Sequence, residues 1–257
     1  MDEKTFQGDL RGARFVEASL HGARFTESDL SAVVMRGVDV AGADIDAPWL
    51  EGGSTLLVNG VDVAPFVEAE LDRRFPGRAR KRAADPAGLR AAWAEVERAW
   101  DAALERAAAM PAGSVEISVD GEWSFSQTLR HLVMATDTWL RQAVLRLDDP
   151  HHPIGQPDAS YGSGEGDTTA FTADQPSYAD VLQVRAERVA MVRDFIAALT
   201  PEKLDEARAN PHSPEHPETV RSCLHTILEE EWEHLRFALR DLDAIDGAAP
   251  TTTRTAP

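Results

Sequence analysis

Residues 8–47 carry apolar side chains with a strict period of five. Large apolar residues occupy every fifth position, and mostly small residues lie two positions before each of them. The large positions are Leu10, Phe15, Leu20, Phe25, Leu30, Met35, Val40 and Ile45. Neither a helix, with a period of about 3.6, nor a strand, with a period of about 2, produces this pattern. A square solenoid with one five-residue side per repeat does, so residues 1–50 are predicted to form a short β-solenoid.

Residues 51–85 are predicted to link this repeat to the rest of the chain. Asn59-Gly60, a strong turn signal, lies between two short apolar runs and predicts a hairpin. A short helix is expected from Pro65 to Phe75. Six basic residues then gather between Arg73 and Arg82. We expect this basic cluster to pair with acidic side chains, and an anion or partner contact is the alternative.

From residue 86 onward the apolar period becomes helical and predicts four helices. Their predicted starts lie near residues 86, 124–126, 177 and 218. Alternating Val115, Ile117 and Val119 predict one short strand between the first two helices. Arg185 interrupts the apolar stripe of the third helix. The pattern favours a mainly α fold, with a four-helix bundle over residues 86–245.

Two further segments of the chain are predicted to lack regular structure. A long loop rich in Pro, Gly and Asp occupies residues 148–176, between the second and third helices. The tail, residues 246–257, is low in apolar residues and is predicted to be disordered.

Acidic residues outnumber basic ones by 44 to 26, which gives a net charge of −18 and a pI of about 4.8. Because a nucleic-acid binder needs a basic face, we expect no binding to DNA, RNA or anionic membranes. No apolar run reaches the roughly 18 residues of a membrane span, and the acidic start lacks a signal-peptide core, so a cytoplasmic protein is expected. The single cysteine, Cys223, excludes an internal disulfide and leaves His and carboxylates as the ligands for any metal.

The candidate chemistry lies on the second and fourth helices. Glu230 and His234 are four residues apart, about 40° around a helix axis, and share an apolar face. A buried carboxylate and imidazole are costly unless they are paired or coordinated. His131 is the one histidine in the other three predicted helices. Together the three residues predict a divalent-metal site between facing helices, with Zn²⁺ or Ni²⁺ suiting these ligands best.

Other polar residues carry weaker signals. His151 and His152 lie on the long loop, and His212 and His216 lie among prolines; we interpret all four as loop residues, with a lid or an extra ligand as the alternative for the first pair. Glu229, Glu231 and Glu233 are general-base candidates by proximity alone, and a charged helix face explains them better. Trp139 and Trp232 are expected to pack rather than to stack on a substrate. Cys223 is interpreted as a buried core residue.

Two resemblances to known families extend this interpretation. The repeats GDLRG, ARFVE, ASLHG, ARFTE, SDLSA, VVMRG, VDVAG and ADIDA resemble the pentapeptide-repeat family, whose fold is a right-handed β-solenoid. Residues 86–245 resemble the DinB/YfiT-like superfamily, and in particular its branch related to mycothiol-dependent maleylpyruvate isomerase. The matching motifs are W-x₇-H, from Trp123 to His131, and E-x₃-H, from Glu230 to His234. Many members have a histidine where this chain has Glu230.

The DinB-like resemblance implies a divalent metal held by His131, Glu230 and His234, with an open position for water or substrate. It also implies mycothiol or a similar low-molecular-weight thiol as cosubstrate, so a metal-dependent thiol transferase or isomerase acting on a small-molecule substrate is expected. A homodimer is left open by the resemblance. The alternatives are a scaffold or sensor with a vestigial site, and an acidic pentapeptide-repeat module that binds a protein partner. Residues 1–50 hold nine acids and five bases, so little of the charge lies in that segment.

Overall fold

The structure, a computed structural model, describes residues 4–48, 50, 53–157 and 168–248. The chain divides into two compact units, Met1–Asp46 and Ala47–Pro257. In the described ranges, no helix is both long and apolar enough to cross a membrane. Of the tail that is predicted to be disordered, residues 246–248 instead belong to the last helix, and residues 249–257 lie outside the described ranges.

The N-terminal unit turns with the period that the sequence predicts. Every fifth residue from position 12 to position 42 has a positive φ. These residues are Gly12, Glu17, Gly22, Glu27, Ala32, Gly37 and Gly42. Reverse-turn hydrogen bonds recur every ten residues, beginning with Ala13 N to Leu10 O at 3.0 Å. Glycine suits such corners because it has no Cβ to hinder a positive φ. The five-residue period is therefore a period of backbone corners.

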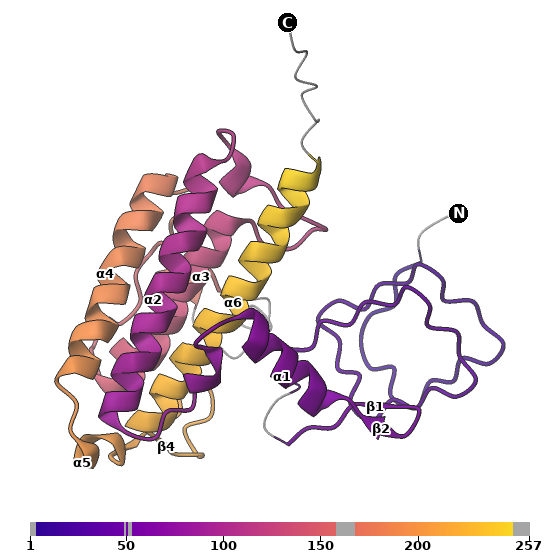
Figure 1. Ribbon diagram of the computed structural model, residues 1–257, viewed down its shortest axis with the longest axis horizontal. Helices are drawn as coiled ribbons and strands as arrows, with labels where there is room; N and C mark the ends of the chain where they lie inside the picture. The colour runs from indigo at the N-terminus through magenta and orange to yellow at the C-terminus, as the bar shows by residue number, and fades with distance from the viewer. Residues whose placement is uncertain (1–3, 49, 51–52, 158–167, 249–257) are drawn as a thin grey trace, which may run out of the picture. The chain divides into compact units, whose positions relative to one another are not determined.

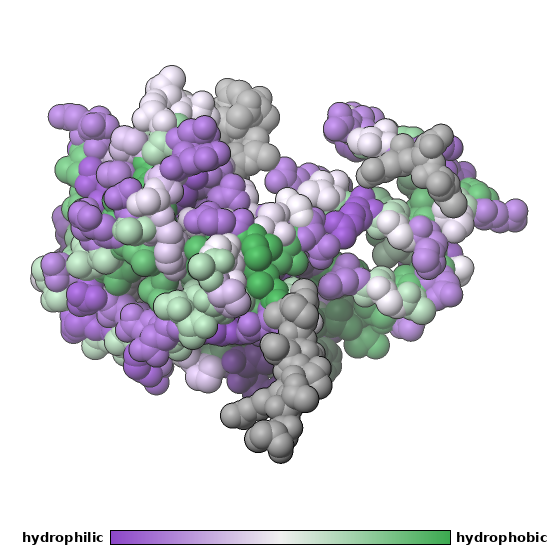
Figure 2. Space-filling view, turned by 90° about the horizontal axis from the view of Figure 1, so that it is seen from above, coloured by the Kyte–Doolittle hydropathy of each residue, from purple (hydrophilic) through white to green (hydrophobic). Residues whose placement is uncertain are grey.

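The strands and the inward stacking of a β-solenoid are not observed in residues 4–46. This range contains no assigned strand, and the large apolar side chains of the repeat are 46–63% exposed. Figure 2 shows apolar residues, in green, at the surface of this unit. The physical reason is size: two coils give each coil at most one neighbour, so little apolar surface can be buried. The expected solenoid thus appears only as a regular winding of the backbone.

The second unit begins with a small hairpin and a short helix. Strands β1 (Leu57–Val58) and β2 (Val61–Asp62) pair antiparallel. Asn59 and Gly60 both have positive φ, 52° and 82°, as the tight turn between such strands requires. Helix α1 (Ala64–Arg74) follows with Pro65 in its first turn, and the 3₁₀ turn η1 (Arg78–Arg80) comes next.

Four long helical segments form the bundle (Figure 1). They are α2 (Pro86–Ala109), α3 (Phe125–Thr136) continued by the π-helix η3 (Asp137–Val144), α4 (Tyr178–Ala197) and α6 (Val220–Ala248). The side chains of Asp85, Ser124 and Ser177 cap α2, α3 and α4 by accepting hydrogen bonds from backbone N–H groups in the first turn. Ser124 and Gln127 form a reciprocal capping box.

The connections contain shorter elements. They are η2 (Ser114–Glu116), η5 (Thr168–Ala170), α5 (Pro201–Leu204) and the antiparallel pair β3 (Ala207–Arg208) and β4 (Glu218–Thr219). The strand predicted from Val115 to Val119 is wrong, since this segment starts as the 3₁₀ turn η2. An alternation over five residues is too short to distinguish a strand from a tight turn with one side facing the core.

The bundle core explains the polar interruption in the third predicted helix. Arg185 on α4 is buried and forms an ion pair with Glu231 of α6, which is also buried. The guanidinium lies 5.7 Å from the ring centre of Trp100, a cation–π contact. The core-facing side of α4 is therefore buried without interruption, and one of its positions is an arginine in an ion pair. The fully buried apolar residues of the core include Leu89, Trp93, Leu129, Leu132, Leu140, Ile196, Leu224, Leu228 and Trp232.

Most of the basic cluster of residues 73–82 pairs with acids, as the sequence predicts: the paired residues are Arg73, Arg74, Arg78, Lys81 and Arg82. Arg78 is buried, and its guanidinium donates to Glu68 (2.9 Å), Asp72 (2.8 Å) and Glu233 (3.3 Å). Arg82 pairs with Glu229 of α6. These bonds fix the segment after α1 against the outer side of α6.

Candidate metal centre

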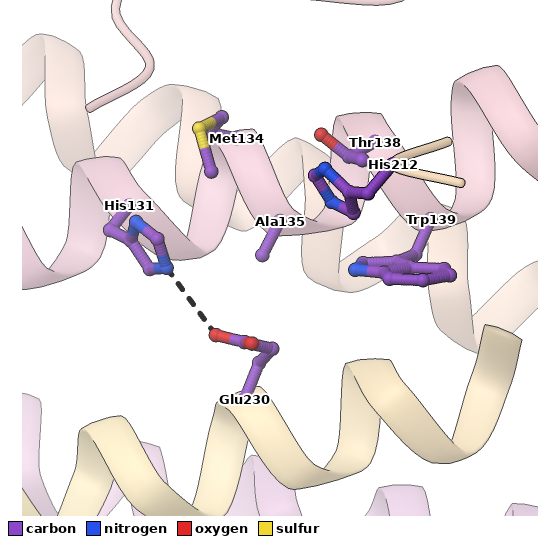
Figure 3. Close-up of a pocket in the computed structure, with 7 residues that line it drawn as sticks. All are labelled: His131, Met134, Ala135, Thr138, Trp139, His212 and Glu230. Atoms are coloured by element: carbon purple, nitrogen blue, oxygen red, sulfur yellow. Dashed lines mark hydrogen bonds and ion pairs between the residues drawn. The ribbon is translucent and has the colours of Figure 1, made fainter. Parts of the chain in front are cut away.

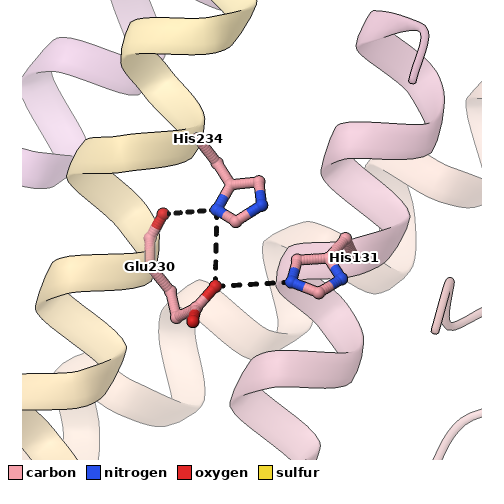
Figure 4. A group of neighbouring side chains, drawn as sticks. All are labelled: His131, Glu230 and His234. Atoms are coloured by element: carbon pink, nitrogen blue, oxygen red, sulfur yellow. Dashed lines mark hydrogen bonds and ion pairs between the residues drawn. The ribbon is translucent and has the colours of Figure 1, made fainter. Parts of the chain in front are cut away.

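His131, Glu230 and His234 come together between α3 and α6 (Figure 4). One potential ligand atom from each side chain lies within 4.8 Å of the others. His131 Nε2 is 3.3 Å from Glu230 Oε2, and His234 Nδ1 is 3.4 Å from the same oxygen. The four-residue spacing on α6 stacks Glu230 over His234, and the contact of α3 with α6 brings His131 opposite them.

Backbone carbonyl groups orient both imidazole rings. His131 Nδ1–H donates to Gln156 O at 3.0 Å, and His234 Nδ1–H donates to Glu230 O at 2.9 Å. Since a carbonyl oxygen only accepts, each neutral ring carries its proton on Nδ1 and has a bare lone pair on Nε2. Histidines that bind metals in proteins usually have this second hydrogen bond.

The bare nitrogen of His131 faces another acceptor. In the neutral ring, the Nε2 lone pair points at a carboxylate oxygen of Glu230 only 3.3 Å away. Two acceptors at this distance repel each other unless a proton or a cation lies between them. The arrangement fits either a shared proton or a divalent cation, which imidazole nitrogen and carboxylate oxygen both coordinate.

Burial keeps His234 neutral. Desolvation, followed by the neighbouring His131, lowers the pKa of His234 from 6.5 to about 4, although Glu230 acts in the opposite direction. At neutral pH this imidazole is therefore available as a metal ligand.

Aromatic rings surround the two histidines. The ring of Trp123 lies 4.7 Å from that of His131 and 6.2 Å from that of His234, and the two imidazoles are 4.6 Å apart. Phe237 meets His234 edge-on at 5.7 Å. Trp123 begins the W-x₇-H motif, so the motif joins a ligand candidate to the ring that packs on it.

The long loop after η3 contributes a contact that sequence reasoning missed. Arg130 Nε donates to Ile154 O (2.8 Å) and its Nη2 donates to Ala173 O (2.9 Å), while Gln156 N donates to Arg130 O (3.2 Å). These bonds hold the loop against α3 and place the carbonyl of Gln156 on His131. A backbone oxygen carries no signal in the sequence. Residues 158–167 of this loop lie outside the described ranges.

A small pocket of about 60 Å³ opens beside the three residues (Figure 3). His131 and Glu230 lie at one end of this pocket, and Trp139 and His212 lie at the other. The rings of Trp139 and His212 are 5.6 Å apart. The sequence predicts His212 to be a loop residue; it does lie on the β3–β4 loop, and that loop places it in the pocket. Trp139 likewise lines the pocket rather than the core alone.

The remaining candidates lie elsewhere. His151 is 3.2 Å from Thr138 Oγ1 through its Nε2, and His152 Nδ1 accepts from Ile154 N at 3.2 Å, so both stabilise the loop. Neither belongs to the group of residues whose ligand atoms converge.

The acidic residues next to Glu230 form ion pairs with arginines. Glu229 pairs with Arg82, and Glu233 with Arg78 and Arg236. Glu231, which pairs with Arg185, and Glu233 are both buried, so their predicted place on a charged outer face is wrong. Cys223 is buried as predicted, and burial raises the pKa of its thiol to about 12.

The fold is thus a helical bundle, and its His/Glu cluster has the geometry of a metal site between two facing helices. A family model of the DinB superfamily matches residues 95–238, and a model of pentapeptide repeats matches eight copies over residues 8–46. Because the first match covers more than half of the chain, the protein belongs to the DinB superfamily. Members of this superfamily typically bind metal. No curated protein and no solved structure matches the chain.

Proposed function

We propose that the protein binds a divalent metal through His131, Glu230 and His234 and acts as a metal-dependent transferase or isomerase that uses a low-molecular-weight thiol. The observation that carries the metal site is the pair of facing acceptors, His131 Nε2 and Glu230 Oε2, 3.3 Å apart. Superfamily membership supports the same role. Two imidazoles and one carboxylate suit Zn²⁺ or Ni²⁺.

Three protein ligands leave room for a substrate group at the metal. A bound Zn²⁺ or Ni²⁺ would lower the pKa of a coordinated thiol and so supply a nucleophilic thiolate near neutral pH. Other groups of the chain would position and enclose the site. The carbonyl groups of Gln156 and Glu230 orient the imidazole rings, and the rings of Trp123 and Phe237 would restrict the access of water. His212, at the far end of the pocket, is the imidazole best placed to exchange a proton with a bound ligand.

The thiol role is tested with protein loaded with Co²⁺ in place of the native metal. Titration with mycothiol, and separately with glutathione, should give a thiolate-to-cobalt charge-transfer absorption if the sulfur reaches the metal. The His212→Gln variant keeps the metal residues and should still show the band. A cobalt spectrum that none of the thiols changes would exclude metal-bound thiol chemistry while leaving the metal site intact.

A second candidate function is a non-catalytic partner-binding module. The exposed apolar side chains of the N-terminal repeat favour it, because large apolar residues at a surface often mark a contact site. The net charge of −18 opposes nucleic-acid binding. A homodimer is compatible with either function. Metal-free protein that still captures a partner through residues 1–50 would support the module over the enzyme.

A further inference from the structure

A second cavity, of about 330 Å³, is lined by the β3–β4 loop, which also lines the pocket at the candidate metal centre. Its walls come from the end of η3, from the second residue after η3, and from the loop. The residues used below are Gln142, Ala143, Arg146, Ala209, Pro211 and Pro214. A volume above about 300 Å³ is typical of cavities that bind small organic molecules.

The pocket beside His131 is too small to hold a substrate with its cosubstrate. At about 60 Å³ it has room for about two water molecules of ~30 Å³ each. A ligand whose reacting group enters this pocket must therefore place its remaining atoms elsewhere.

The two cavities are lined by neighbouring residues of η3 and of the β3–β4 loop. Trp139 lines the first cavity and Ala143, one helical turn further along η3, lines the second. His212 of the loop lines the first, and its neighbour Pro211 lines the second. A molecule that passes between η3 and this loop would thus contact both cavities.

The second cavity combines an apolar wall with a cation. Ala143, Ala209, Pro211 and Pro214 offer hydrocarbon, while Arg146 brings the charge. Within the part of the chain that the structure describes, Arg146 forms no ion pair, and its one hydrogen bond goes to Ala207 O at 3.4 Å. In a chain with a net charge of −18, an arginine without a carboxylate partner at a cavity is suited to bind an external anion.

We propose that this cavity binds an apolar organic carboxylate, with the carboxylate on Arg146 and the hydrocarbon against the alanine and proline wall. Its position assigns it to the remote end of the small molecule whose reacting end enters the first cavity. That assignment rests on the proposed function, whereas binding of a carboxylate to the cavity does not require a metal.

The experiment uses 4-fluorobenzoate as the probe and fluorine NMR of the full chain without added metal. 4-Fluorobenzamide, equal in shape and uncharged, is the matched control ligand. Arg146→Gln should weaken binding of the carboxylate about fivefold, and Arg146→Lys should weaken it less. Ala209→Phe, at an exposed position on the cavity wall, should fill the space and weaken both ligands. Arg90→Gln removes an exposed charge from α2, far in sequence from the cavity, and should change nothing.

The outcomes separate this proposal from that of the metal centre. The cavity is supported if carboxylate binding depends on Arg146 and Ala209, does not respond to Arg90→Gln, and persists in His131→Ala. It is overturned if the probe binds more weakly than about 10 mM, or if Arg146→Gln binds it as the native protein does. Metal analysis of the Arg146→Gln variant, whose content should equal that of the native protein, reports on the proposed function separately.

Discussion

At the scale of single residues, the candidate site consists of one carboxylate and two imidazoles. The sequence predicted all three, because Glu230 and His234 are polar residues on an apolar helix face and His131 is the matching residue on the second helix. What it could not predict is the direction of each ring. The carbonyl groups of Gln156 and Glu230 set that direction, and every residue type has a carbonyl.

The ion pair between Arg185 and Glu231 is a second feature that the sequence pattern could not predict. The sequence suggested an interrupted stripe on one helix and a charged face on another. The structure joins both departures into one buried ion pair. Pairing between residues 46 positions apart depends on how the helices pack, which a one-dimensional pattern does not contain.

Arg130 is predicted to be a positioning residue for His131. Arg130→Ala removes the hydrogen bonds to Ile154 O and Ala173 O, so the loop that presents the carbonyl of Gln156 should loosen. Outer contacts of this kind change metal affinity by about 10- to 100-fold, and we expect a loss of about tenfold. Competition with a chromogenic chelator measures it, with Arg90→Ala as the control. Unchanged affinity in Arg130→Ala would show that the loop does not orient the ring.

At the scale of elements, helices were predicted well where a cap marks their start. Asp85, Ser124 and Ser177 each precede an apolar-periodic run, and each caps the helix that was expected there. The π-helix η3 was not predicted, because widening a helix changes hydrogen-bond partners without a distinct residue pattern. Segments without a cap or a long period, such as residues 115–119, were the ones misassigned.

Gly77 is predicted to be required where the start of η1 packs against α2. It has a φ of 103°, and a Cβ on it would lie 2.6 Å from Glu95 Cβ. Gly113 has a similar φ of 89° but open space around it, so it isolates the backbone effect. Gly113→Ala should cost about 1–2 kcal/mol of unfolding free energy, and Gly77→Ala about 2–4 kcal/mol. Urea unfolding of the two variants measures the difference; equal losses would mean that the contact with Glu95 is relieved without cost.

At the scale of the whole molecule, the two units differ in how much of their structure the sequence predicts. For Ala47–Pro257 the pattern gave the bundle, and the match to the DinB superfamily agrees with it. For Met1–Asp46 the pattern gave the repeat, which the family match confirms, but not the degree of burial. A period states which residues are equivalent, while burial depends on how many coils are stacked.

The stability of the whole chain is predicted to fall in mild acid. Burial lowers the pKa of His152, His225 and His234 in the folded chain. Below about pH 6.5 the unfolded chain therefore binds more protons than the folded chain. The unfolding free energy is therefore highest above pH 6.5 and decreases as the pH falls towards 4. His234, whose pKa is lowered to about 4, accounts for up to about 3 kcal/mol of this decrease. Urea unfolding of chelator-treated protein at several pH values tests this. His225→Gln should show a shallower slope, and a flat profile in the native protein would contradict the account.

The central claim is that one divalent ion joins the two helices at His131, Glu230 and His234. Elemental analysis of untagged protein tests it most directly, beside His131→Ala, His234→Ala and the matched control His225→Ala, which removes another histidine of α6. We predict about one Zn or Ni per chain in the native protein and in His225→Ala, with loss in the other two variants. A native protein without metal after supplementation, or full metal content in His131→Ala and His234→Ala, would contradict it.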